Sequence, residues 1–351
     1  MNPKVKIEAE EEAGIETSIP GPASPPAPAA TPALPSRMFI ITVHPNGTNP
    51  LSVILDLYNQ PSTMAIDNLF SGAFKACFES SRTASRGCLI ANSQQAMRSS
   101  IDAADYAWAH AFHQGKALCA NICAPWLIDP TVLNIYPAPA HAVVQGDTSM
   151  FKARVPASYA SALGGLFNYT NMNLSMFPDE YLRTWGMTFV IIHPIILFPL
   201  IYHALTSSLL PDIQHSCALH MTYHWAVTLY KWAQADAAAP TPIIIEADAL
   251  MDIPEHLFSR FCKQTRLQLD PDLVRYQDAR AYRETRLWNY KEYRDRFVRL
   301  IAEGRSTLDA IIELAKRVWV ASFGALAAGV IEDCIRAAEG DFMYLYDRRL
   351  Q

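Results

Sequence analysis

The sequence has few charges, and it lacks the short motifs that mark several large enzyme classes. Charged residues make up 18% of the 351 residues and hydrophobic residues 50%, so most of the chain can bury a full core and is neither disordered nor fibrous. No G-x-x-x-x-G-K-[ST], G-x-G-x-x-G, G-x-S-x-G or H-E-x-x-H pattern is present. Nucleoside triphosphatases, dinucleotide-dependent enzymes, serine hydrolases and zinc proteases are therefore not indicated. The net charge of −5 excludes a protein that coats nucleic acid along its whole length.

Cysteine is sparse as well. The seven cysteines are scattered and odd in number, which is not a disulfide framework. Cys119 and Cys123 lie four residues apart without a second pair at zinc spacing, so we expect buried small side chains and no metal site. The acidic start of the chain has no apolar stretch typical of a secretory signal, and we expect a cytoplasmic protein.

One stretch without any formal charge, residues 184–211, is long enough to cross a bilayer. Two prolines and two histidines interrupt it, and flanking basic residues are few. We therefore expect a buried strand at Met187–Ile192, a turn at His193-Pro194 and a buried helix at Ile195–Ser208. A membrane span is the alternative.

The rest of the chain alternates between apolar strands and helices. Residues 1–36 are acidic and then rich in Pro and Ala, which predicts a disordered tail, and residues 37–351 form a single domain. Three further strands are expected, at 38–43, 116–125 and 243–246, with helices after Pro50 and Pro254. The C-terminal third, from about Pro271, is mostly helical, with helices expected at 280–303 and 307–338. This pattern predicts an α/β fold with a parallel sheet flanked by helices.

The segments MFPDEYLRTWGMTFVIIHPIILFPLIYHAL, PIIIEADALMDIPEHLF and LDPDLVRYQ resemble the fungal sulfotransferase-like, P-loop-type family, and they come in the family's order. The resemblance covers most of residues 37–350 and implies the three-layer fold that sulfotransferases share with nucleoside kinases. It also implies binding of the sulfonate donor PAPS (3′-phosphoadenylyl sulfate). The family carries a basic residue where this chain has Asn46, an Arg where it has Ile192, and ionisable residues where it has the uncharged run Leu118–Cys123.

These departures argue against a normal donor site. A charge-assisted hydrogen bond contributes about 1.5–3 kcal/mol, against about 1 kcal/mol for a neutral one. Losing two or three of them weakens the binding of a multiply anionic nucleotide by several kcal/mol, unless arginines from elsewhere compensate. The candidates are Arg37, Arg154 and Arg183. We expect no cofactor, with PAPS retained only under the alternative that the chain is a sulfotransferase.

A vacated nucleotide site leaves a concave region at the carboxyl ends of the strands. There we expect His44, His193 and Glu246 to be catalytic, because imidazoles and carboxylates transfer protons near neutral pH. The expected substrate contacts are Asn46, Thr48, Asn49, Asp248, Trp185 and Tyr202. Each has a structural alternative: histidines and amides that complete turns, acids that cap loops, and aromatics of the core. Asp179, Glu180 and Arg183 are expected to form an ion pair where a helix starts.

These residues lead to a specific functional hypothesis. The chain is predicted to be a cofactor-independent tailoring enzyme of fungal secondary metabolism that closes a polyketide intermediate into a lactone such as an α-pyrone. Its expected partners are an apolar, polyketide-like substrate and a polyketide synthase. The alternatives are a PAPS-dependent sulfotransferase acting on a small hydroxylated molecule, and a non-catalytic binding or scaffold protein. No nucleic acid is expected, because the basic run at 280–299 is typical of an amphipathic helix.

Overall fold

The computed structural model describes residues 36–43, 50–82, 86–136, 151–160, 167–207, 213–247, 255–274 and 307–350. They belong to one compact unit, Pro35–Gln351. The expected tail lies outside the described residues except for Ser36, and so does the expected helix at 280–303.

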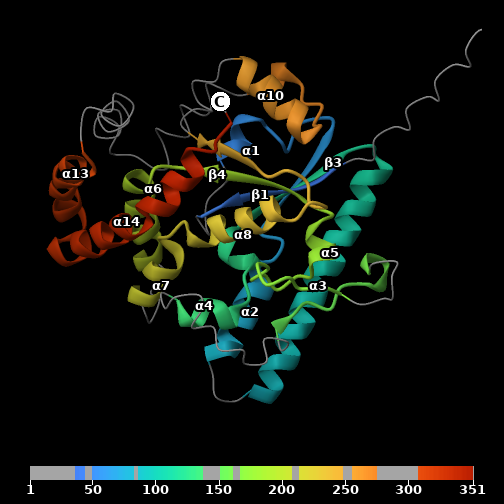
Figure 1. Ribbon diagram of the computed structural model, residues 1–351, viewed down its shortest axis with the longest axis horizontal. Coiled ribbons are helices and arrows are strands. Elements are labelled where there is room, and N and C mark those ends of the chain that lie inside the picture. Colours follow the sequence, from blue (N-terminus) through green and yellow to red (C-terminus); the bar gives the residue numbers. More distant parts are fainter. Residues whose placement is uncertain are drawn as a thin grey trace, which may run out of the picture. The chain divides into compact units, whose positions relative to one another are not determined.

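A five-stranded parallel sheet organises the unit (Figure 1). Its strands are β1 (Arg37–Thr42), β2 (Thr63–Asp67), β3 (Ala117–Cys123), β4 (Gly186–Ile191) and β5 (Ile243–Glu246), in the order β2-β3-β1-β4-β5. The predicted parallel sheet flanked by helices is confirmed, and the architecture is consistent with the sulfotransferase-like α/β fold. The sequence did not reveal β2, because this edge strand is short and only partly buried.

Both faces of the sheet are covered by helices. On one face, Met38 and Ile40 of β1 pack with Leu51 of α1 (Pro50–Ile54) and Phe261 of α10 (Glu255–Thr265). The opposite face of β1 belongs to a larger core to which further helices contribute: α2 (Ser71–Arg82), α3 (Arg86–His113), α4 (Pro130–Ile135), α6 (Pro194–Ser207), α7 (Ile213–His220), α8 (His224–Ala235), α13 (Leu308–Phe323) and α14 (Ala325–Tyr346). In Figure 1, α1 and α10 lie above the sheet and α2, α4 and α8 below it. Burial on both faces explains why the strands are continuous apolar runs.

The C-terminal helices differ from the prediction in one respect. The expected helix at 307–338 is two helices, α13 and α14, which are separated by Gly324. Gly324 has φ 87° and ψ 164°, a conformation that is essentially restricted to glycine. The helix expected after the charge-free strand is confirmed as α6, which contains Pro199 and is 14 residues long. Among the described residues no helix is both long and apolar enough to cross a membrane.

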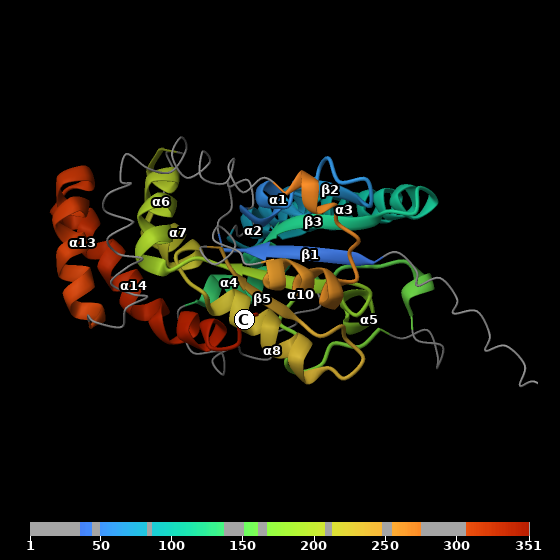
Figure 2. The same cartoon turned by 90° about the horizontal axis from the view of Figure 1, so that it is seen from above.

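The connections of the strands determine where a site can form. After β1 the chain crosses to α1 on one face, whereas after β4 it continues into α6 on the opposite face. In open α/β sheets, ligands bind at the carboxyl ends of strands where the connections diverge in this way. Figure 2 shows α6, α13 and α14 grouped beyond one end of the strands. This is the carboxyl end, because α6 begins three residues after β4 ends.

Candidate functional site

Four of the nine predicted site residues are described by the structure: Trp185, His193, Tyr202 and Glu246. His44, Asn46, Thr48, Asn49 and Asp248 lie outside the described residues, so their roles stay predictions. Residues 44–49 follow β1, which is the strand at which the connections diverge.

His193 and Glu246 are brought to the same edge of the sheet. Glu246 is the last residue of β5 and pairs in register with Ile191, the last residue of β4. His193 follows β4 by two residues, and its ring packs on Phe342, which belongs to the same core as Ile191. The structure thus places an imidazole and a carboxylate on neighbouring strand ends.

The surroundings of His193 define its protonation. The side chain is 8% exposed, and its ring lies 4.9 Å from the ring of Phe342 in α14, centroid to centroid. Burial lowers its pKa to about 4, so the ring is neutral at neutral pH. Nδ1 accepts a hydrogen bond of 3.2 Å from the backbone N–H of Ile195. The proton of the neutral ring therefore resides on Nε2. In this tautomer His193 is a hydrogen-bond donor at Nε2 and not a base.

This burial predicts a pH-dependent stability. An unfolded chain protonates His193 at its ordinary pKa of 6.5, whereas the folded chain does so only at about 4. The unfolded state therefore binds more protons between these values, and folding stability falls as the pH drops from 6.5 to 4, by about 3 kcal/mol from this residue. Urea unfolding across this pH range should show a smaller acid loss in His193→Phe. An equal loss in both proteins would contradict the assignment.

Glu246 has a partner that the sequence did not reveal. Arg349, which follows α14, places its Nε 3.3 Å from Oε2 of Glu246. The backbone N–H of the next residue, Leu350, donates to the carbonyl of Ile244 at 2.8 Å. The sequence contains two arginines after α14, but no spacing rule predicts that one of them contacts a strand a hundred residues earlier.

The two predicted aromatic contacts lie elsewhere. Trp185 directly precedes β4, at the amino edge of the sheet, and is 1% exposed. Its ring stacks on Phe39 at 4.0 Å between centroids and 6° between planes. The structure therefore places Trp185 in the core and not beside His193. Tyr202 is partly buried on α6, where it contacts Phe323 of α13 (centroids 5.8 Å apart), and burial raises its pKa. It lies eight residues beyond the start of α6, about 12 Å along the helix.

A cluster of hydrogen-bonded polar side chains joins α1 to the carboxyl ends of β2 and β3. Ser52 Oγ donates to Asn121 Oδ1 at 2.7 Å, and Asn121 Nδ2 donates to Asp67 Oδ1 at 2.6 Å. Tyr58 donates its hydroxyl to the same carboxylate at 2.6 Å. In the sequence, Asn121 is one residue of the uncharged run Leu118–Cys123. Its contacts show that it fixes α1, and hence the start of the helix after residues 44–49, against the sheet.

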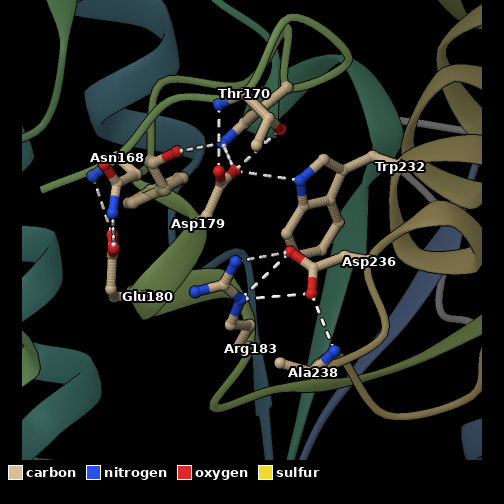
Figure 3. Close-up of polar contacts among 10 residues, drawn as sticks. Asn168, Thr170, Asp179, Glu180, Arg183, Trp232, Asp236 and Ala238 are labelled. Carbon is tan, nitrogen blue, oxygen red and sulfur yellow. Dashed lines mark hydrogen bonds and ion pairs between the residues drawn. The ribbon is translucent and has the colours of Figure 1, made fainter. Parts of the chain in front are cut away.

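The PDEYLR segment is structural (Figure 3). Asp179 accepts hydrogen bonds from the backbone N–H of Thr170, from Asn173 Nδ2 and from Trp232 Nε1, at 2.6–2.9 Å. Glu180 accepts from the backbone and side chain of Asn168. The expected helix-start ion pair is replaced by a longer-range one, because Arg183 pairs with Asp236, which follows α8, at 2.8 Å.

Of the residues proposed to compensate for lost cations, Arg37 and Arg183 lie at the wrong edge. Arg37 is the first residue of β1; it donates to the Tyr159 hydroxyl at 2.6 Å and lies 3.6 Å from Asp105. Arg183 precedes β4 and is held by Asp236. Both amino-terminal positions are distant from the carboxyl ends of the strands, where a donor phosphate would bind.

The described carboxyl edge does not fit a multiply anionic nucleotide. The strands end in Asp67, Thr42, Cys123, Ile191 and Glu246, and Arg349, a described cation at this edge, is paired with Glu246. At Ile192, where the resemblance implies an arginine, the backbone N–H donates to the Tyr223 hydroxyl at 3.0 Å, and this hydroxyl also bonds the Ile192 carbonyl. Cys123 is fully buried.

Comparisons with known proteins point to one group of relatives. The chain is 25% identical over 353 residues to sulfotransferase ppzF of Metarhizium rileyi (strain RCEF 4871), in an alignment that covers 92% of this chain and 98% of that protein. It is 25% identical over 218 residues to sulfotransferase ppzF of Metarhizium majus (strain ARSEF 297), covering 56% of this chain and 62% of that protein. No protein-family model and no solved structure matches the chain. Together with the fold, these similarities support a sulfotransferase-like family of fungal enzymes.

Proposed function

We propose that the chain is an enzyme that processes an apolar small molecule by acid/base chemistry at the carboxyl edge of its sulfotransferase-like sheet, without a sulfonate donor. One observation carries this proposal. The described strand ends present two carboxylates and a neutral imidazole where a donor site needs free cations.

The described residues have distinct chemical roles. The Nε2–H of His193 donates a hydrogen bond to an oxygen that gains negative charge, which lowers the barrier most in a buried site. The Glu246 carboxylate accepts the proton, as general bases do. His44 is the other candidate base. Asn46, Thr48, Asn49 and Asp248 remain candidate substrate contacts, as does Tyr202.

The concrete reaction is lactonisation of a linear polyketide held as a thioester. An enol oxygen attacks the thioester carbonyl, so a C–O bond forms and the C–S bond breaks. The enol proton passes to the base and is then delivered to the departing thiolate. The products are a lactone, such as an α-pyrone, and a free thiol. No oxidant, reductant or group donor is required, which suits the described carboxyl edge, where Arg349 is paired with Glu246.

The second candidate is a PAPS-dependent sulfotransferase. It is favoured by the name of the relative that aligns with 92% of this chain. Under this candidate, Arg154 or cations from residues outside the described ranges would have to bind the donor.

Calorimetry and an activity assay separate the two candidates. With adenosine 3′,5′-bisphosphate, the acid/base enzyme should give no binding heat at micromolar concentrations, whereas a sulfotransferase should bind in that range. With a linear polyketide thioester, the wild type should form the lactone. If Glu246 is the base, Glu246→Gln should lower kcat by about 100- to 10,000-fold; if His44 is the base, His44→Ala should do so. Full activity in both variants would refute acid/base catalysis by these residues.

A further inference from the structure

The segment after α14 returns to the outer strand of the sheet. β5 is the edge strand, and β4 is its described neighbour. The N–H of Leu350 donates to the carbonyl of Ile244, two residues before Glu246. This hydrogen bond lays residues 347–350 beside the carboxyl end of β5. The neighbouring residue, Arg349, therefore reaches the candidate site from a part of the chain that the family resemblance does not connect with it.

Arg349 is held from three sides. Its Nε lies 3.3 Å from Oε2 of Glu246, and its Nη1 donates to the carbonyl of Tyr346 at 2.7 Å. Its guanidinium carbon lies 3.5 Å from the centroid of the Tyr346 ring. The side chains of Arg349 and Glu246 are 22% and 18% exposed, so their interaction is screened less than that of a surface pair.

A guanidinium held in this way offers the Glu246 carboxylate a cation at a defined position. The guanidinium of Arg349 is already immobilised by stacking and by a backbone hydrogen bond, so pairing with Glu246 costs little additional side-chain entropy. Orientation matters for catalysis, because a displacement of about 1 Å in a catalytic group can lower the rate by about 100-fold.

The adjacent arginine provides a natural comparison. Arg348 donates to the carbonyl of Tyr344 at 2.8 Å and lies 3.8 Å from the Tyr344 ring. Like Arg349, Arg348 therefore bonds the carbonyl of a tyrosine in α14 and stacks on the ring of the same tyrosine. Arg348 forms no ion pair with a carboxylate among the residues that the structure describes. The two arginines thus differ mainly in whether they reach Glu246.

We propose that Arg349 is the positioning residue of Glu246. The inference rests on the proposed role of Glu246 as the base and deepens it. It assigns to Arg349, on the segment after α14, a part in the reaction that acts through Glu246.

A double-mutant cycle tests this role with the polyketide thioester as substrate. Arg349→Met should lower kcat by about 10- to 100-fold with little change in KM, and Arg349→Lys should restore part of the loss. In the background of Glu246→Gln, Arg349→Met should have no further effect, because the group that it positions is gone. Arg348→Met, the matched control, should keep the wild-type kcat.

Four outcomes contradict the inference or its premise. A wild-type kcat in Arg349→Met, or a full additional loss on top of Glu246→Gln, would overturn the positioning role. The same loss in Arg348→Met would show that the segment acts only through stability, which thermal unfolding of all variants checks. If Glu246→Gln alone keeps the wild-type kcat, the assignment of the base under the proposed function fails instead.

Discussion

Replacing Asp179 with alanine is expected to cost about 3–5 kcal/mol of folding stability, because the buried donors Asn173 Nδ2 and Trp232 Nε1 lose this acceptor. Asp179 is completely buried. Its carboxylate accepts hydrogen bonds from the Thr170 backbone, from Asn173 and from the Trp232 indole of α8. Each unsatisfied buried donor costs about 1–3 kcal/mol, so the sum is large even if the site partly relaxes.

Urea unfolding measures this loss, and an exposed aspartate serves as the control. Asp309 pairs with Arg336 at 2.6 Å, but its side chain is 75% exposed. Asp309→Ala should therefore change stability by less than about 1 kcal/mol. Similar small losses in both variants would show that the Asp179 network is not a stabilising element.

Trp185→Ala is expected to destabilise the fold by about 3–5 kcal/mol, the range for truncating a buried aromatic side chain. The indole stacks on Phe39 in the centre of the sheet, and Tyr181 lies next to it at 6.3 Å between ring centroids. Trp185→Phe keeps an aromatic ring over Phe39 and should cost clearly less than the alanine variant.

The same pair of variants decides between a core role and the substrate contact that the sequence predicted. For a core residue, denaturant unfolding shows the loss, and KM for the polyketide thioester stays unchanged in Trp185→Phe. A raised KM together with wild-type stability would instead support a substrate contact.

The sequence was most informative where strands are buried on both faces. The apolar runs that predicted β1, β3, β4 and β5 each occur at the expected place. β2 was not predicted, because TMAID is an edge strand whose middle residues are only partly buried and therefore contains no continuous apolar run. The break between α13 and α14 at Gly324 was not predicted, because a single glycine is also tolerated inside a helix.

The candidate site was predictable only in part. The positions of His193 and Glu246 follow from the strand ends that the sequence indicates, and the structure places both at one edge. The tautomer of His193 depends on one backbone hydrogen bond, which no pattern reveals. Arg349 reaches Glu246 only because the chain folds back along β5. Trp185 was predicted to contact the substrate, whereas the structure buries it in the core, stacked on Phe39.

The position of β1 in the middle of the sheet has a consequence for how the protein folds. β1 pairs with β3 on one side and β4 on the other, so Met38 contacts Cys119 and Gly186 across the sheet. During translation on the ribosome, about 80 further residues are added before β3 is made, and about 150 before β4 is made. Parallel pairing over such separations is slow, and an unpaired apolar strand is prone to aggregate. Chaperones that shield this strand in the nascent chain should therefore raise the yield of active protein.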